Sequence, residues 1–276
     1  MIGEARRARY PPRMSEVSEV VDEARRTSFD ARAGLYDAVR PSYPDALADD
    51  VMARAGRRVL EIGAGTGKAT AVFARRGASI LAIEPGPELA AVLRRNLAGC
   101  DVTVEQVTFE AWPIERRFDV VMAAQAIHWI DPAVRYAKPA DVLGPGGTLA
   151  VVYNETEGFE HGLGDALEAA YARWGPLSSE PPGDDPVGDA VRMRSGEIAA
   201  SGRFERPEVL RYPWTAIYTT ERYLDLLDTY SDHALLAPDR RGPLYQAIAD
   251  AIERSGGALE IRYVSLAIVA RCAGRR

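Results

Sequence analysis

The stretch VLEIGAGTGKAT, residues 59–70, joins a short apolar run to a glycine-rich turn and then to the beginning of a helical pattern. Short apolar runs and helical patterns continue to alternate as far as residue 154. Such alternation predicts a parallel sheet that is covered by helices on both faces. The fold expected from this pattern is a doubly wound, Rossmann-like α/β domain, with the glycine-rich turn at the carboxyl end of its first strand.

Glycine spacing in the turn distinguishes three kinds of ligand-binding loop. A phosphate-binding Walker loop needs four residues between its first glycine and its Gly-Lys pair, but only three residues separate Gly63 from Gly67. A dinucleotide-binding loop needs a third glycine where Lys68 stands, and it does not account for Glu61. A third pattern, an acidic residue followed by x-Gly-x-Gly-x-Gly, is met in full by residues 61–67.

A second acidic residue indicates an adenosine ligand. Glu84 ends the next predicted strand, where a carboxylate can accept hydrogen bonds from both ribose hydroxyls. Dehydrogenases use the same device, so Glu84 indicates adenosine and leaves the rest of the cofactor open. The glycine spacing therefore has to identify the cofactor.

The acidic glycine loop and two later segments resemble the class I S-adenosylmethionine-dependent methyltransferases, in their branch of small-molecule enzymes. The later segments are FDVVMAAQAIHWID at residues 118–131 and VLGPGGTLAVV at residues 142–152. The resemblance covers about residues 29–153 of the chain. It implies S-adenosylmethionine as the cofactor and methylation of a small molecule, expected in secondary metabolism, as the function.

By this resemblance, the loop holds the methionine part of the cofactor and the next strand end holds the adenosine. The expected contacts are Glu61, Gly63, Ala64, Gly65 and Gly67 at the methionine part, Glu84 at the ribose and Pro85 near the adenine. In relatives an acidic residue often meets the adenine amino group, but Thr108 stands at that place in this chain. Thr108, the backbone of Phe109 and Glu110 are alternatives for the contact. The Phe109 ring is expected to pack on or beside the adenine, or else to belong to the core.

The segment after the fourth predicted strand is expected to face the reaction. The carboxyl end of this strand opens toward the ligand crevice of a doubly wound sheet, which brings Ala124, Gln125 and His128 toward the methyl donor or the acceptor. The family's N-terminal segment tends to close over the cofactor, so Tyr36 and Arg40 are candidates for contact with the methionine carboxylate. The alternative for Arg40 is a surface role at the end of the preceding helix.

Methyl transfer needs an acceptor held in line with the sulfonium carbon, and it needs a base only where the acceptor is protonated. His128 is the best candidate for that base, because an imidazole titrates near physiological pH. A structural role beside Trp129 is the alternative. His161 and His233 are weaker candidates, and no metal site is expected because no residues show metal-ligand spacing.

The sequence outside the predicted core is expected to complete the site. An amphipathic helix at residues 15–27 belongs to an N-terminal helical lid, residues 1–56, and the cofactor-binding core covers residues 57–154. A cap insertion follows at residues 155–206, and residues 207–276 complete the sheet and the acceptor pocket. The last two apolar runs predict an antiparallel hairpin, which brings the mostly parallel sheet to seven strands.

The composition limits the partners of the protein. The chain has 34 basic and 40 acidic residues, and the net charge of −6 argues against a nucleic-acid partner, which needs a basic face. Two cysteines show no disulfide framework, and no secretory signal or long apolar stretch is present, so a cytoplasmic protein without a membrane span is expected. The oligomeric state is left open.

Two other functions remain open from the sequence. One is a nicotinamide-dependent oxidoreductase, which Lys68 in the glycine loop disfavours. The other is a methyltransferase fold that binds the cofactor without transferring its methyl group, for instance to assist a cyclisation. Binding of NAD would indicate the first function, and cofactor binding without a methylated product would indicate the second.

Overall fold

The structure is a computed structural model that describes residues 30–159, 163–176 and 185–273. The predicted helix at residues 15–27 and the candidate His161 lie outside the described residues. The chain divides into two compact units, each built from three stretches of sequence. Unit 1 comprises Met1–Arg40, Glu155–Val187 and Pro213–Val264, and unit 2 comprises Pro41–Asn154, Gly188–Tyr212 and Ser265–Arg276.

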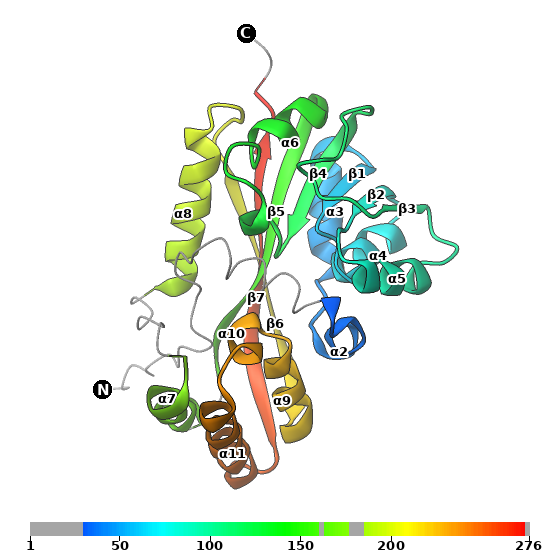
Figure 1. The fold of residues 1–276 in the computed structure, drawn as a ribbon. Coiled ribbons are helices and arrows are strands. Elements are labelled where there is room, and N and C mark those ends of the chain that lie inside the picture. The colour runs from blue at the N-terminus through cyan, green and yellow to red at the C-terminus, as the bar shows by residue number, and fades with distance from the viewer. Residues whose placement is uncertain (1–29, 160–162, 177–184, 274–276) are drawn as a thin grey trace. The chain divides into compact units, whose positions relative to one another are not determined.

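Within the described residues, seven strands form one sheet in the order β3-β2-β1-β4-β5-β7-β6 (Figure 1). The strands are β1 Arg58–Ile62, β2 Ser79–Ile83, β3 Val102–Glu105, β4 Phe118–Ala124, β5 Leu143–Phe159, β6 Glu208–Thr219 and β7 Ala258–Arg271. β1 pairs in parallel with β2 and β4, β2 with β3, and β4 with β5, whereas the C-terminal strands form an antiparallel hairpin. The predicted doubly wound, mostly parallel fold is confirmed. The strand order reverses between β1 and β4, and ligands bind beyond the carboxyl ends of the strands at such a point.

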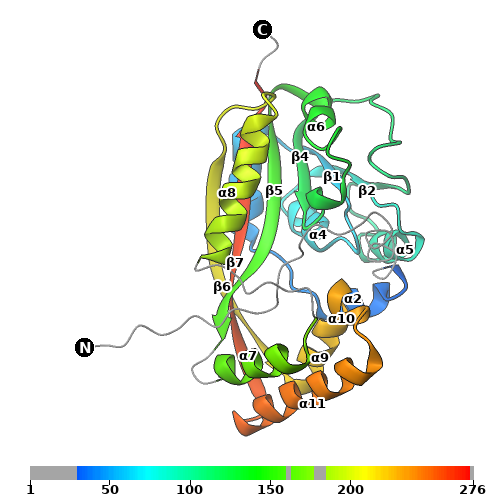
Figure 2. The same cartoon turned by 60° about the vertical axis from the view of Figure 1, so that its left-hand side comes forward.

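Helices of unit 2 pack on the parallel part of the sheet. They are α3 Asp45–Ala55, α4 Lys68–Arg75, α5 Pro87–Asn96, α6 Ala137–Val142 and most of α8 Pro186–Ala200, with a 3-10 turn at Ile127–Trp129. In α3, the apolar residues Leu47, Val51 and Met52 recur at helical spacing and are buried. They share one core with residues of α4, α5 and the strands. Figure 2 shows α8 alongside the β5 and β7 part of the sheet.

Two helical segments are interrupted or delayed by local chemistry. The segment after β4 becomes a regular helix only at Ala137, because Pro139 has no N–H to donate to the carbonyl of residue 135. After β6 the chain forms two helices, α9 Thr220–Asp228 and α10 Ser231–Ala234. Between them, the Thr229 hydroxyl donates to the carbonyl of Leu226 at 2.6 Å, which competes with continuation of the helix.

Unit 1 has a core rich in tyrosine. Its helices are α2 Ala33–Val39, α7 Leu163–Trp174, α9, α10 and α11 Pro238–Arg254. α11 packs against α7 and α9, and Trp214 stacks on Tyr263 with ring centroids 4.6 Å apart. No helix in the described residues has both the length and the apolar character of a membrane span.

The units divide the chain differently from the expected lid, core and cap. α3 was expected in the lid at residues 1–56, but it belongs to unit 2 because its buried face packs on the strands. Residues 188–206, expected in the cap, also belong to unit 2. The unit that contains the glycine loop is therefore larger than the predicted core.

Candidate functional site

The glycine loop adopts a backbone that side chains rarely allow. Gly63, Gly65 and Gly67 have φ angles of 65°, 58° and 88°, in the left-handed region that favours glycine. A Cβ atom at Gly63 would lie 2.7 Å from the Cβ of Ala126, and a Cβ at Gly67 would overlap with Leu93. Glycine is therefore required at Gly63 and at Gly67 for two reasons. The backbone conformation at each position favours glycine, and a Cβ atom at either position would be too close to a neighbouring side chain.

The loop is bound to the carboxyl end of β2. The N–H groups of Gly63 and Ala64 donate to the carbonyl of Ile83 at 2.8 and 3.1 Å. The carboxylate of Glu84, which is 5% exposed, accepts from the N–H of Gly65 at 2.7 Å and from the N–H of Gly86 at 2.8 Å. The structure thus joins Glu84 to the glycine loop, and its contact with a ribose stays a prediction.

Glu61 is a buried acid at the base of the loop. Its side chain is 1% exposed, and its Oε2 atom has no hydrogen-bond partner among the described residues. The pKa of Glu61 is raised to about 8, mainly by burial, with an opposing effect of Thr70 and a smaller contribution from the charge of Glu84. The carboxyl group is therefore mostly protonated at neutral pH when no ligand is bound. An unpartnered buried oxygen is costly, and a ligand with a positive charge would supply the missing partner.

Gln125 follows β4 and holds a strained backbone conformation. Its φ angle is 55°, and no other non-glycine residue among those described has a positive φ. Its N–H donates to the carbonyl of Val152 at 2.8 Å, and its side-chain amide donates to the carbonyl of Asn154 at 2.9 Å. Ala126, the next residue, is the one that faces Gly63. The segment that contains Ala124 and Gln125 therefore lies against the glycine loop, and strain of this kind is common at functional sites.

His128 is half-buried at the end of this segment. Its ring lies against Trp129 with centroids 4.7 Å apart. Burial, together with the positive charges of Arg194 and Arg135, lowers the pKa of His128 to about 3. The imidazole is therefore neutral at physiological pH and can accept a proton, but without a ligand it is a weak base. The catalytic role of His128 stays a prediction.

The residues expected at the adenine are held by contacts within the protein. Phe109 is 2% exposed and stacks on Trp112 with ring centroids 6.4 Å apart, and the Nζ of Lys138 lies over the Phe109 ring, 5.1 Å from its centroid. This position fits the core alternative for Phe109. The hydroxyl of Thr108 accepts from the N–H of Ala111 at 3.3 Å, and Glu110 accepts from the N–H of residue 131 at 3.0 Å. Pro85 is exposed. Contact of these residues with adenine stays a prediction.

Comparison with known proteins identifies the family of the chain. A family model described as a methyltransferase domain matches residues 59–147. An uncharacterized methyltransferase of Mycobacterium tuberculosis is 35% identical over 209 residues, which is 74% of this chain and 76% of the relative. The chain belongs to the class I S-adenosylmethionine-dependent methyltransferases. The alternative of a nicotinamide-dependent oxidoreductase is thereby overturned.

Solved structures share the fold of this methyltransferase. A candidate type II methyltransferase of Anaeromyxobacter dehalogenans has a TM-score of 0.61 at 24% identity, over 84% of this chain and 97% of that one. Phosphoethanolamine N-methyltransferase 2 of Haemonchus contortus, solved with phosphomonomethylethanolamine and S-adenosylhomocysteine, has a TM-score of 0.51 at 15% identity. It covers 94% of this chain and 61% of that one. At these identities the likeness concerns the fold alone.

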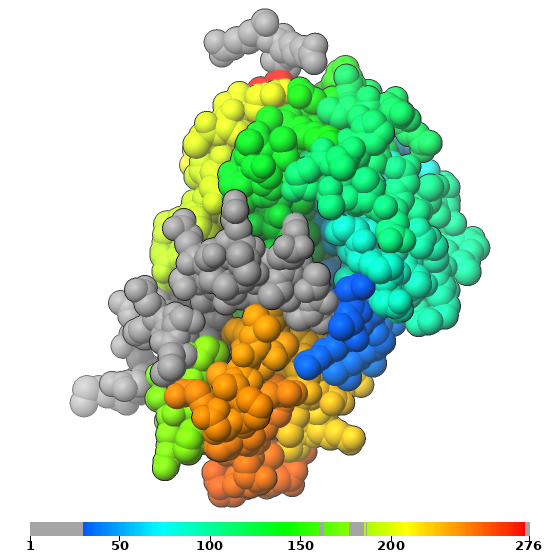
Figure 3. Space-filling model, viewed as in Figure 1, coloured from blue at the N-terminus to red at the C-terminus, as the bar shows by residue number. Residues whose placement is uncertain are grey.

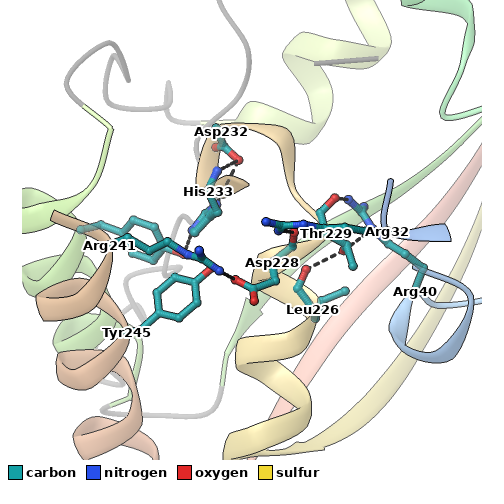
Figure 4. Close-up of polar contacts among 10 residues, drawn as sticks. Arg32, Arg40, Leu226, Asp228, Thr229, Asp232, His233, Arg241 and Tyr245 are labelled. Atoms are coloured by element: carbon teal, nitrogen blue, oxygen red, sulfur yellow. Dashed lines mark hydrogen bonds and ion pairs between the residues drawn. The ribbon is translucent and has the colours of Figure 1, made fainter. Parts of the chain in front are cut away.

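Tyr36 and Arg40 of the methyltransferase lie in unit 1, whereas the glycine loop lies in unit 2. Figure 4 shows Arg40 directed at Thr229: its Nε donates to the hydroxyl at 2.8 Å and one Nη donates to the carbonyl at 2.6 Å. The guanidinium also lies over the rings of Tyr230 and Tyr36, at 4.1 and 5.1 Å from their centroids. The half-buried side chain of Arg40 thus connects the end of α2 to Thr229 within unit 1, and its contact with the methionine carboxylate stays a prediction.

His233 is fixed inside unit 1 by partners on both ring nitrogens. Asp232 lies 3.0 Å from Nδ1 and the hydroxyl of Tyr171 lies 2.8 Å from Nε2, as Figure 4 shows for the aspartate side. Burial raises the pKa of Tyr171 far above its ordinary value, so the phenol donates its proton and Nε2 accepts it. Asp232 then accepts from Nδ1–H. Sequence reasoning missed Tyr171, because 62 positions separate it from His233 and no local pattern links them.

A second set of residues that the sequence did not indicate lies in unit 2 around α8. The hydroxyl of Tyr136 donates to Glu197 at 2.6 Å, and Arg194 donates to the two oxygens of Glu197 at 3.2 and 3.1 Å. Arg135 stands 3.9 Å from the same carboxylate and donates to the carbonyl of His128 at 3.3 Å. Figure 3 shows α8 in yellow and the green segment that leads to α6 on the same face of the molecule. The i, i+3 spacing of Arg194 and Glu197 was the one available signal, and it is typical of any exposed helix.

The described residues contain no candidate metal site. No three His, Cys, Asp or Glu side chains there are arranged to hold an ion. Cys100 and Cys272 are both free thiols.

Proposed function

We propose that the protein transfers a methyl group from S-adenosylmethionine to a small-molecule acceptor, with the cofactor held by residues 61–67 and Glu84. The observation that carries the proposal is the Glu84 carboxylate, which the N–H groups of Gly65 and Gly86 hold beside the glycine loop at the carboxyl end of β2. This is the position from which an acid accepts two ribose hydroxyls in nucleotide-binding sheets.

The charge and shape of the loop fit this cofactor. The methionine part of S-adenosylmethionine carries positive charge on its sulfur and on its amino group, and Glu61 offers an unpartnered carboxyl oxygen beside the loop. The left-handed glycines leave backbone surface uncovered, so a ligand can approach it closely. Binding of the cationic part would favour the charged form of Glu61 and release its proton.

The cofactor supplies a methyl group on a positively charged sulfur, and the protein supplies position. In-line displacement gains most from holding the acceptor about 3 to 3.5 Å from the methyl carbon, on the side opposite the leaving sulfur. Residues 124–128 lie against the glycine loop through Ala126, so they are the part of unit 2 best placed to orient an acceptor. His128 is neutral and can take the proton that an O–H or N–H acceptor loses.

A small molecule is the acceptor class that the charge supports. The net charge of −6 disfavours a polyanionic nucleic acid, whose binding depends on a basic surface. The type of methylation, on oxygen, nitrogen or carbon, follows from the acceptor and not from the fold.

Binding and turnover test the proposal separately. Calorimetry should give micromolar binding of S-adenosylmethionine and S-adenosylhomocysteine to the wild type, and Glu84→Gln should weaken it about tenfold or more, because a charge-assisted acceptor is lost. Glu115→Gln, an exposed residue outside the loop, is the matched control. Gly65→Val should abolish binding in a folded protein.

A screen with isotope-labelled cofactor and mass spectrometry of extracts should then detect a methylated product. Binding of NAD in place of S-adenosylmethionine would contradict the assignment of the loop. Tight cofactor binding with no methylated product from any acceptor would favour the non-transferring alternative.

A further inference from the structure

The side chains around α8 carry an unbalanced positive charge. Arg135 and Arg194 are both half-buried, with side-chain exposures of 15% and 14%, and Glu197 is the one carboxylate that pairs with both among the described residues. Tyr136 is a neutral donor to that carboxylate. Two guanidinium groups removed from water against one carboxylate leave one positive charge without a counter-ion, which is costly unless an anion is added.

Arg194 is the member of this pair that has N–H donors without an acceptor among the described residues. Arg135 uses its Nε and one Nη on the carbonyls of Ile130 and His128. Arg194 donates through Nη1 to Glu197, and within the described residues no other group accepts a hydrogen bond from it. Its Nε and Nη2 donors form the planar fork that matches an oxyanion.

A series of contacts within unit 2 connects Arg194 to the glycine loop. Its Cζ lies 5.8 Å from the ring centroid of Tyr153, near the carboxyl end of the parallel part of β5. The residue before Tyr153 accepts the hydrogen bond from Gln125, and the residue after Gln125 faces Gly63. The positive charge of Arg194 therefore lies on the side of the glycine loop where residues 124–128 lie.

We propose that Arg194, supported by Arg135, binds an anionic group, a carboxylate or a phosphate, of the methyl acceptor beside His128. This inference rests on the proposed function and narrows its substrate class to acceptors that carry an oxyanion. Arg194 is a binding residue in this scheme, and Arg135 is a positioning residue that acts through its hold on the segment of His128.

The electrostatics of His128 agree with a cationic site. Burial lowers the pKa of His128, and Arg194 and Arg135 are the charges that lower it further. A bound oxyanion would offset those charges, so the imidazole would hold a proton more readily when the acceptor is present. The other titratable groups of the cluster are Tyr136, Tyr153 and Glu197, of which only the carboxylate carries a charge at neutral pH.

Histidine NMR on the full chain tests the site without any turnover. Inorganic phosphate and, separately, acetate are titrated at constant ionic strength, and the His128 resonance is identified with a His128→Asn variant. The wild type should show a saturable shift of His128, while His233, which is buried with both nitrogens engaged, should not respond. A shift with phosphate alone or with acetate alone tells which anion the site prefers.

Three variants separate an anion site from a purely structural cluster. Arg194→Met should weaken phosphate binding about tenfold to a hundredfold, and Arg194→Lys should retain part of it. Glu197→Gln should bind phosphate more tightly, an effect that loss of structure would not produce. Arg192→Met, on the same helix but exposed and paired with Asp189, should behave as the wild type.

The outcomes distinguish this inference from the proposed function. No saturable shift in the wild type, or an equal shift in Arg194→Met, would overturn the anion site even if methyl transfer were found. Phosphate binding that depends on Arg194, in a protein that transfers no methyl group, would leave the anion site standing and remove the proposed function. With labelled cofactor, an acidic acceptor should be methylated at least tenfold faster than its methyl ester, and the reverse preference would overturn the substrate class.

Discussion

Replacement of Glu61 by glutamine should stabilise the ligand-free protein by an amount that grows with pH. Burial raises the pKa of Glu61 from the ordinary value of 4.5 to about 8. An unfolded chain releases this proton above its ordinary pKa, whereas the folded protein keeps it until about pH 8. The folded state thus binds one more proton within this window, so its stability falls as the pH rises from 4.5 to 8.

The size of the effect follows from the width of the window. Each pH unit well inside it costs about 1.4 kcal/mol of unfolding free energy, and the cost per unit falls as the pH approaches the pKa of the folded state. From pH 6 to pH 8 the wild type should therefore lose about 2 kcal/mol through this one group. Glu61→Gln has no proton to release and should escape the loss, so the difference between the two proteins should widen by the same amount.

Urea unfolding of both proteins without cofactor at pH 6, 7 and 8 measures this difference. Glu115→Gln, an exposed residue on the loop before β4, serves as the control and should follow the wild type at every pH. All other titrating groups are common to the proteins compared, so they cancel in the difference. A gap between wild type and Glu61→Gln that stays constant from pH 6 to pH 8 would refute the account of a buried acid with a raised pKa.

Three further changes follow from the packing. Gly63→Ala places a Cβ 2.7 Å from the Cβ of Ala126 at a φ of 65°, so it should lower the unfolding free energy by about 1 to 3 kcal/mol and weaken cofactor binding, by urea unfolding and calorimetry. Tyr171→Phe leaves the buried Nε2 of His233 without a donor and should cost about 1 to 3 kcal/mol in the same unfolding assay. Lys138→Met removes an ammonium that donates to the carbonyls of residues 109 and 110 at 2.6 and 2.9 Å, and hydrogen exchange of residues 108–112 should then be faster, with a loss of about 2 kcal/mol. Unchanged stability in any of the three would contradict the contact concerned.

Local patterns were sufficient to predict the cofactor side of the fold. The glycine spacing at residues 61–67 and the acid at the end of the next strand are short-range features, and the structure joins them through the bond from Gly65 to Glu84. Both depend on backbone rules that hold for any doubly wound sheet. This is why a single sequence was enough to identify them.

Contacts between distant segments could not be predicted in the same way. Arg194 and Glu197 lie on a helix whose charge spacing is ordinary. They form a cluster only because Arg135 and Tyr136, from another part of the chain, also contact the Glu197 carboxylate. Phe109 is a different case, since a large aromatic residue after β3 fits either the adenine or the core. Its stacking on Trp112 is a packing contact that sequence periodicity cannot predict.

Because each unit is built from three separate stretches of the chain, the order of synthesis affects how the protein folds in the cell. Ala267 and Val269 on β7 lie in the same buried core as Leu47 and Val59, although the ribosome makes them long after β1. Until β7 is made, β5 lacks its neighbour on that side and presents an unpaired strand edge, which invites aggregation. The nascent chain must therefore hold a glycine loop and five parallel strands in an incomplete sheet, and fragments that stop before residue 258 should be poorly soluble.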